Sequence, residues 1–327
     1  MANEVSSLSE QIKAGDRRAL AKAITLVEST RADHRQQATE LLESLMSTTG
    51  NSIRIGISGA PGVGKSTFIE AFGNHLIAQG HSVAVLAVDP TSAVSGGSIL
   101  GDKTRMQTLA FAEKAFVRPS PAGQTLGGVT RRTRESLLLC EAAGFDIILV
   151  ETVGVGQSET AVADMTDMFL LLLLPAGGDE LQGIKRGIME LADLIVVNKA
   201  DGDQASSAHQ TITDYRSALH FMPSRFSSWQ AAVMACSSLH GQGVDKVWQQ
   251  VEAFRSAVTE AGELQQNRQS QARSWMWNET VEALIADLKD HPQVRSLIPE
   301  LEEAVIEGRL PPTVAAQRLI EHYKTSG

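Results

Sequence analysis

The chain is poor in cysteine, and its histidines are scattered. Only two of its 327 residues are cysteines, Cys140 and Cys236, and its eight histidines form no tract. Two cysteines so far apart cannot build a disulfide framework, which suits a reducing compartment, so we expect a cytoplasmic protein. No Cys-x-x-Cys pair accompanies the histidines, which argues against a cysteine–histidine metal site.

Long apolar runs and an excess of positive charge are also missing. The longest apolar run, 168–174, is far too short to cross a bilayer and is typical of a strand covered on both faces. The N-terminus lacks the apolar core of a signal peptide. The formal net charge of −9 argues against nucleic acid or an acidic membrane as the main partner. We therefore expect a globular protein with no nucleic-acid and no membrane partner.

A glycine-rich segment lies between a predicted strand and a predicted helix. The strand, 53–57, alternates β-branched residues, and the following helix carries apolar residues at helical spacing until Gly80. The segment has the pattern GxxxxGK[ST], whose backbone N–H groups surround phosphate oxygens at a helix N-terminus. Lys65 would reach the β- and γ-phosphates, and the Ser66 hydroxyl would ligate Mg²⁺. The residues expected to bind a nucleoside triphosphate are Gly59, Ala60, Pro61, Gly62, Val63, Gly64, Lys65, Ser66 and Thr67.

A second motif, NKxD, indicates which base is bound. Asn198, Lys199 and Asp201 follow an apolar predicted strand. The Asp201 carboxylate can accept hydrogen bonds from N1–H and the exocyclic amine of guanine, a donor pair that adenine lacks. Lys199 can pack its stem over the base, and Asn198 can tie this loop to the phosphate loop. The later segment Ser237-Ser238-Leu239 would close over guanine O6 through backbone N–H groups. The sequence therefore predicts binding of GTP and GDP rather than ATP.

Acidic residues end two further predicted strands. Asp89 follows one strand and Glu151 ends the next, and the carboxyl ends of parallel strands lie at one edge of a sheet. Acids there can hold Mg²⁺ directly or through water, although they could also do no more than cap the strand ends. Gly154 can offer its N–H to the γ-phosphate. Gln157 is a candidate for orienting the attacking water, although it lies beyond the usual position.

The distribution of periodic segments predicts an α/β fold with a mostly parallel, doubly wound sheet. Residues 1–48 are helical in pattern, with a break at Gly15-Asp16, and 49–255 alternate strands with helices. Residues 256–327 return to helix, so helical extensions flank a central G domain at both ends. The expected strands are 53–57, 83–88, 115–118, 145–151, 168–174, 194–198 and 231–235.

Two helical segments carry conspicuous side chains. In the C-terminal extension an apolar stripe runs through Trp277, Val281, Leu284 and Leu288. It could join two chains or pack back on its own G domain. In the central domain Arg131, Arg132 and Arg134 open a predicted helix, and we expect them to form a solvated face rather than an arginine finger.

Four segments together resemble the MeaB/ArgK family of G proteins. They are AVDPTS at 87–92, GGSILGDKTRM at 96–106, ETVGVGQSE at 151–159 and GDELQGIK at 178–185. The match extends over almost the whole chain, including both helical extensions. The resemblance implies a P-loop GTPase that forms homodimers through its C-terminal arm. It also implies a chaperone that gates adenosylcobalamin loading of methylmalonyl-CoA mutase and protects this adenosylcobalamin-dependent enzyme.

The resemblance assigns roles to individual residues. It makes Asp89, Asp102 and Glu151 the magnesium-site acids beside Ser66. The first switch would be 92–106 and the second 151–164. A third switch, 177–185, would relay the nucleotide state to the mutase, through Asp179, Gln182 and Lys185.

The expected reaction is GTP hydrolysis driven by positioning and electrostatics. Lys65, Mg²⁺ and the loop N–H groups would bear the developing phosphate charge. Hydrolysis by the free protein should be slow and quickened when a partner orders the switches. The alternative is a kinase or ATPase associated with lysine, arginine and ornithine transport. NKxD argues against it, because an ATP-using enzyme needs no carboxylate that reads guanine.

Overall fold

The computed structural model describes residues 2–88, 106–119, 126–152, 158–175 and 186–325. The chain divides into two compact units, Met1–Arg268 and Gln269–Gly327.

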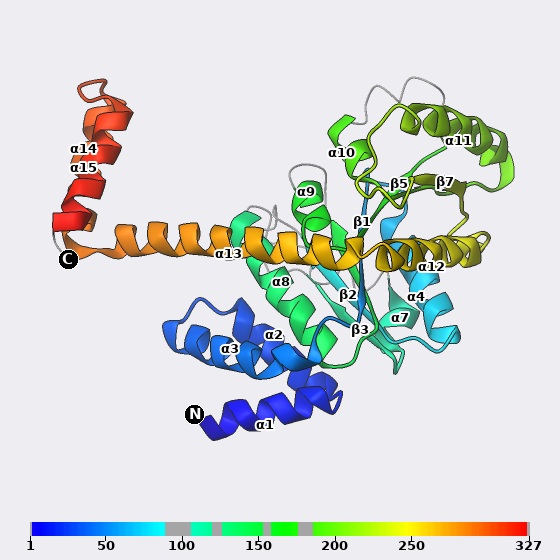
Figure 1. Ribbon diagram of the computed structural model, residues 1–327, viewed down its shortest axis with the longest axis horizontal. Helices are drawn as coiled ribbons and strands as arrows, with labels where there is room; N and C mark the ends of the chain where they lie inside the picture. Colours follow the sequence, from blue (N-terminus) through cyan, green and yellow to red (C-terminus); the bar gives the residue numbers. More distant parts are fainter. Residues whose placement is uncertain (1, 89–105, 120–125, 153–157, 176–185, 326–327) are drawn as a thin grey trace. The chain divides into compact units, whose positions relative to one another are not determined.

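The first unit is built around a sheet of seven parallel strands in the order β3-β2-β4-β1-β5-β6-β7 (Figure 1). All seven predicted strands are present. Their order places β1 at the centre, so the chain winds in both directions from β1 and confirms the doubly wound prediction. The strands are β1 Ile53–Gly59, β2 Val83–Val88, β3 Ala115–Arg118, β4 Ile147–Thr152, β5 Met168–Leu173, β6 Leu194–Val197 and β7 Ala232–Ala235.

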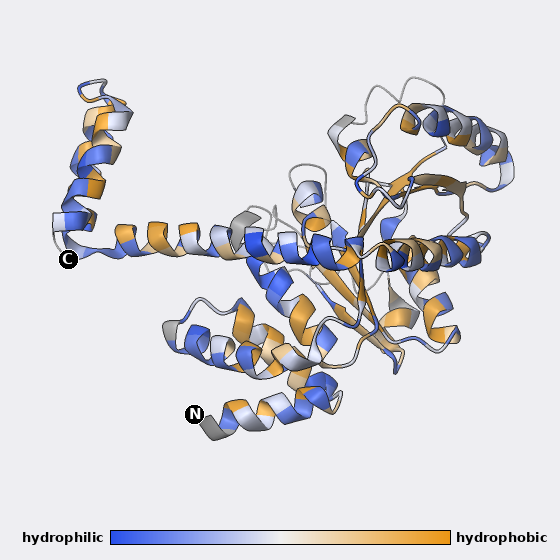
Figure 2. Ribbon diagram, in the orientation of Figure 1, coloured by the Kyte–Doolittle hydropathy of each residue, from blue (hydrophilic) through white to orange (hydrophobic). Residues whose placement is uncertain are grey.

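Helices bury both faces of this sheet. One face packs on α4 (Lys65–Ala78), α7 (Gln107–Phe111) and α12 (Val244–Glu260), through fully buried side chains such as Phe68 and Phe254. On the opposite face, one apolar cluster joins α8 (Leu126–Ala142) and α9 (Ser158–Ala163) to the centre of the sheet. A separate cluster joins α10 (Arg186–Leu191) and α11 (Ala205–Leu219) to β6. Because both faces are covered, the strands are almost continuously apolar, and hydrophobic colouring runs along them in Figure 2.

Three N-terminal helices pack on α8 within the first unit. They are α1 (Ala2–Lys13), α2 (Arg17–Glu28) and α3 (Ala32–Leu45). The predicted break before α2 is present, and Asp16 caps that helix by accepting from the backbone N–H groups of Arg18 at 2.7 Å and Ala19 at 3.1 Å.

A buried ionic network fastens the start of β1. The guanidinium of Arg54 donates to both oxygens of Glu141, at 2.8 and 3.0 Å. Arg268, in the first turns of α13 (Glu263–Asp290), donates to both oxygens of Asp167, at 2.8 and 2.6 Å. Asp167 also accepts from the Arg54 backbone N–H at 2.8 Å. Arg268 therefore fixes the beginning of α13 beside the amino end of β1.

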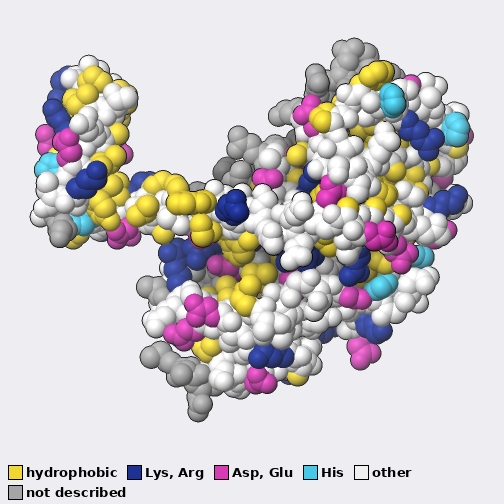
Figure 3. Space-filling model, viewed as in Figure 1, with side chains coloured by type: hydrophobic (Ala, Val, Ile, Leu, Met, Phe, Trp, Pro, Cys, Tyr) yellow, Lys and Arg dark blue, Asp and Glu magenta, His cyan; other side chains and the backbone are white. Residues whose placement is uncertain are grey.

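The second unit contains the rest of α13, followed by α14 (Pro292–Ile306) and α15 (Pro312–Thr325). Helices α14 and α15 pack against each other and bury Val294, Leu301 and Ala315. On α13 the predicted stripe is exposed at three of its four positions, whereas Leu288 is half-buried. Figure 3 shows hydrophobic side chains along this helix. The exposed apolar residues of α13 are Met276, Trp277, Val281, Leu284 and Ile285.

Within the described residues, no helix combines the length and apolar character needed to span a membrane.

Candidate nucleotide site

The phosphate loop connects the end of β1 to the start of α4. Its glycines are required by backbone geometry and by close neighbours. Gly62 and Gly64 have φ values of 82° and 92°, in the left-handed region that side chains disfavour. A Cβ on Gly64 would lie 2.9 Å from Asn198 Nδ2, and one on Gly59 would lie 2.6 Å from the Leu172 carbonyl oxygen. The loop can therefore take this shape only with glycine at these positions.

Lys65 lies over this loop, among acidic side chains. Its Nζ donates to the Gly59 carbonyl oxygen at 2.7 Å. Burial lowers the pKa of Lys65, while the Glu151 and Glu159 carboxylates act in the opposite direction. Both acids are almost fully buried, at 4% and 1% exposure. Lysine and carboxylates thus form one charged cluster where β1 and β4 end.

Glu159 belongs to this cluster, although the sequence places it only within the second switch and gives it no role beside Lys65. It lies in α9, on the chain after the second-switch motif. The available signal was its place within ETVGVGQSE, the segment on which the family resemblance rests. The sequence does not show that Glu159 lies near Lys65, because the fold brings α9 next to the phosphate loop.

Asn198 connects the NKxD loop to the two other segments of the site. Its Nδ2 donates to the Val63 carbonyl oxygen at 2.8 Å, inside the phosphate loop. Its Oδ1 accepts from the backbone N–H of Ser238 at 3.1 Å and from the Ser238 hydroxyl at 2.6 Å. Asn198 is 1% exposed, so these bonds are shielded from water. One amide therefore holds the phosphate loop, the NKxD loop and the serine loop together.

Lys199 makes a second link to the phosphate loop. Its backbone has a positive φ of 56°, the only such value among the described non-glycine residues. Its Nζ donates to the Gly62 carbonyl oxygen at 2.8 Å, so the side-chain stem spans the distance between the two loops. Whether the stem also covers a bound base stays a prediction.

The serine loop differs in one detail from the sequence-based expectation. Ser237 and Gln242 exchange backbone hydrogen bonds, at 2.9 and 3.1 Å, and the Ser238 N–H already donates to Asn198. The backbone donors of both serines are thus used within the protein. Leu239 lies at the tip of the loop and is 76% exposed. If this loop contacts guanine O6, the N–H of Leu239 is the better-placed donor.

Several predicted site residues lie outside the described residues. They comprise two of the magnesium-site acids and five of the residues expected to orient water or to sense or relay the nucleotide state, namely Asp89, Asp102, Gly154, Gln157, Asp179, Gln182 and Lys185. Ser66 and Glu151 are described. Ser66 is the second residue of α4, and Glu151 in β4 pairs in register with Ile57 of β1. No cluster of three or more potential metal ligands occurs in the described part of the chain.

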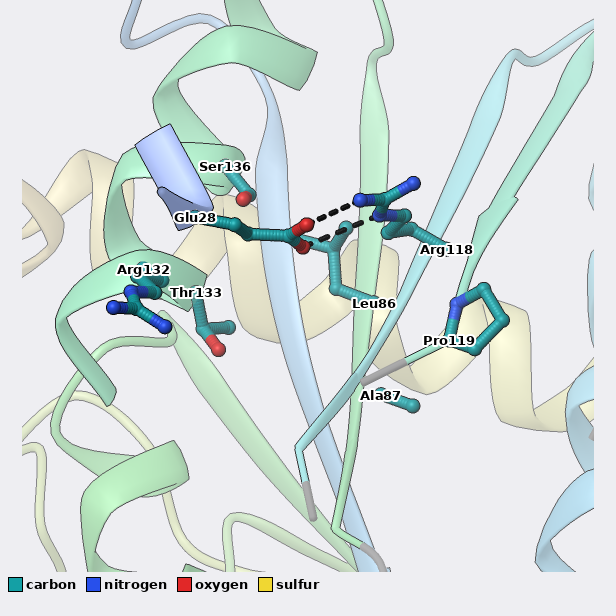
Figure 4. Close-up of a pocket in the computed structure, with 8 residues that line it drawn as sticks. All are labelled: Glu28, Leu86, Ala87, Arg118, Pro119, Arg132, Thr133 and Ser136. Carbon is teal, nitrogen blue, oxygen red and sulfur yellow. Dashed lines mark hydrogen bonds and ion pairs between the residues drawn. The ribbon is translucent and has the colours of Figure 1, made fainter. Parts of the chain in front are cut away.

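A small pocket lies where β2 and β3 end. The arginines expected to form a solvated face of α8 include one that lines this pocket. Figure 4 shows the Glu28 carboxylate turned toward Arg118, which donates to it through Nε at 3.2 Å. Arg132, which also lines this pocket, is 8% exposed, as is Arg134. A solvated face is therefore wrong for both side chains. The reason is tertiary: Arg132 lies beside Glu28 of α2, and Arg134 donates to the Asp164 carbonyl oxygen at 3.4 Å.

Comparisons with known proteins agree with the fold and the motifs. Residues 20–293 match a family model described as methylmalonyl Co-A mutase-associated GTPase MeaB. The Escherichia coli GTPase ArgK is 48% identical over 328 residues, or 99% of each chain. The Mus musculus methylmalonic aciduria type A homolog, mitochondrial, is 49% identical over 321 residues, or 95% of this chain and 77% of that protein. A crystal structure described as a LAO/AO transport system kinase is 40% identical, with a TM-score of 0.78 and 99% coverage of both chains. The chain belongs to the MeaB family and is a GTPase.

Proposed function

We propose that this GTPase is a chaperone of methylmalonyl-CoA mutase, gating adenosylcobalamin loading and protecting the mutase from inactivation. The observation that carries the proposal is the family match, which spans residues 20–293 and whose description names that mutase. The name of the mouse relative, a methylmalonic aciduria type A homolog, points to the same metabolic step. The two cysteines, buried and unpaired, suit a protein of the cytoplasm.

Guanine is read by the Asp201 carboxylate and the loop tip in this proposal. Asp201 accepts from the two N–H donors of guanine, Lys199 covers the base, and the Leu239 N–H donates to O6. The support is the buried Asn198 amide, which fixes both loops against the phosphate loop. Sites organised in this way bind their ligand without a large cost of ordering.

In this proposal the charged cluster at the ends of β1 and β4 carries out GTP hydrolysis. Lys65 stabilises negative charge on the β- and γ-phosphates, and the glycine-loop N–H groups do the same. The hydroxyl of Ser66 and the carboxylates of Asp89, Asp102 and Glu151 would supply hard oxygen ligands, which is the kind that Mg²⁺ prefers. Bound there, Mg²⁺ would neutralise charge on the phosphate oxygens. Gly154 and Gln157 would sense the γ-phosphate and orient water.

A kinase in basic amino-acid transport is the second candidate, because the related crystal structure carries that description. The two candidates differ in the nucleotide they need. Competition of unlabelled GTP and ATP against a fluorescent guanine nucleotide separates them. Strong preference for GTP supports the chaperone proposal, and equal competition by ATP would favour the kinase.

We further propose that the chain forms a homodimer through α13. The support is the exposed apolar surface of this helix, with Trp277 59%, Val281 51% and Leu284 57% exposed. The arm predicted from the sequence starts at residue 256. Helix α12 continues to Glu260 and buries Val258 fully, so a truncation is better placed after Arg268, which keeps its contacts to Asp167.

A chain ending at Arg268 should be a folded monomer that binds GTP, whereas the full chain should be a dimer in light scattering. Full-length Leu284→Asp should also be monomeric, because a carboxylate would be buried in the interface. Glu282→Gln, a change at a neighbouring exposed position, is the control and should remain dimeric. A dimer formed by the truncated chain would place the interface in residues 1–268.

The third switch should link the nucleotide to the client. Alanine at Asp179, Gln182 or Lys185 should preserve basal GTP hydrolysis and abolish its stimulation by methylmalonyl-CoA mutase. A linkage of this kind is worth about 1–3 kcal/mol, or roughly 5- to 150-fold in rate. Phosphate release with and without the mutase measures both rates. Equal losses in both would assign these residues to the chemistry itself.

A further inference from the structure

The serine loop carries a histidine beside the carboxylate that is proposed to read guanine. The mutual hydrogen bonds of Ser237 and Gln242 close the loop, and His240 follows Leu239 at its tip. The imidazole Nε2 of His240 lies 3.4 Å from Oδ2 of Asp201. In the described part of the chain, Asp201 is the one acid within ion-pair distance of His240. Nothing in the sequence motif requires a histidine at this place.

His240 and the guanine base would both bind the Asp201 carboxylate. Guanine presents two parallel N–H donors, so recognition uses both oxygens of Asp201. The Asp201 side chain is only 28% exposed, which restricts the directions from which a donor can reach it. The His240 side chain is 55% exposed, so it can swing into solvent without disturbing the buried bonds of Asn198. A protonated imidazole attracts the carboxylate and draws it away from the base.

We propose that His240 is an internal competitor for Asp201, which weakens guanine-nucleotide binding when its imidazole is protonated. The inference rests on the proposed reading of guanine by Asp201. A neutral imidazole carries no net charge, so it attracts the carboxylate less strongly and the base competes better for Asp201. The competition would therefore be stronger at lower pH, where more of the imidazole carries a charge, and affinity for GDP would fall as the pH is lowered. The size is limited by solvent screening, since the pair is partly exposed.

The test compares dissociation constants for a fluorescent GDP analogue at pH 6 and pH 8, in the full chain and in His240→Ala. At pH 6 the variant should bind about two- to fivefold more tightly than the parent, and at pH 8 the difference should be smaller. The ratio of the two constants removes pH effects common to both proteins. His220→Ala is the matched control, because His220 is exposed and lies at the far end of α11 from this loop. It should follow the parent at both pH values.

Two results would overturn the proposal. Equal affinity of parent and His240→Ala at both pH values would leave the pair without a role in binding. Weaker binding by the variant at both pH values would mean that the ring supports the base instead of competing with it. Asp201→Asn separates these failures from failure of the guanine site itself. If that variant binds GDP as tightly as the parent, the assignment of Asp201 is wrong, whatever His240 does.

Discussion

GTP turnover should fall at least about a hundredfold when Lys65 is replaced by alanine. Lys65 is the one cation that the phosphate loop itself provides, and its Nζ already lies 2.7 Å from a carbonyl oxygen of that loop. Two buried acids, Glu151 and Glu159, are close enough to influence its pKa. Without the ammonium group, the negatively charged phosphates and these carboxylates would have one fewer cation between them. Because further negative charge develops on the phosphate oxygens in the transition state, we expect a loss in kcat.

Multiple-turnover phosphate release measures this effect, and Lys114→Ala provides a matched control. Lys114 also donates to a backbone carbonyl, that of Gly80, at 2.9 Å. It immediately precedes β3 and so lies at the amino ends of the parallel strands, whereas the phosphate loop lies at their carboxyl ends. Its replacement should therefore leave turnover unchanged. Activity retained by Lys65→Ala would indicate a contaminating GTPase or a loop that does not hold the phosphates.

Asp201→Asn should cost about 2–4 kcal/mol of GTP affinity. The substitution turns a pair of acceptors into one acceptor and one donor, so one contact to guanine becomes repulsive. Xanthosine triphosphate carries a carbonyl where guanine has its amine and should gain in relative affinity. Titration with both nucleotides gives the two dissociation constants. Asp203→Asn, two positions along and exposed, is the control. Unchanged GTP affinity of Asp201→Asn would contradict the assigned guanine pocket.

The sequence predicts the local parts of this structure well. All seven strands could be located, because short apolar runs bounded by turns have few other uses in a chain of this composition. The phosphate loop was recognisable for a related reason. Gly59 and Gly64 occupy positions where a Cβ would collide with Leu172 or Asn198, so the pattern records a steric requirement.

Local sequence patterns do not predict contacts between segments that are distant in the chain. Arg132 is buried beside Glu28 of α2, about a hundred residues earlier in the chain, and Arg134 donates to the Asp164 carbonyl oxygen, thirty residues later. The buried Arg268–Asp167 pair joins α13 to the sheet in the same way. The hydrogen bonds that occupy the N–H groups of Ser237 and Ser238 also come from tertiary structure. A helical or strand period gives no information about such partners, because it describes one element at a time.

The most direct test of the chaperone proposal is the rate of GTP hydrolysis by the full chain with and without methylmalonyl-CoA mutase from the same organism. Phosphate release should be slow for the GTPase alone, since its proposed water-orienting and switch residues require ordering by a partner. Adding the mutase should raise the rate about 5- to 150-fold. An equal rate with and without the mutase, at concentrations that saturate any complex, would contradict the chaperone proposal.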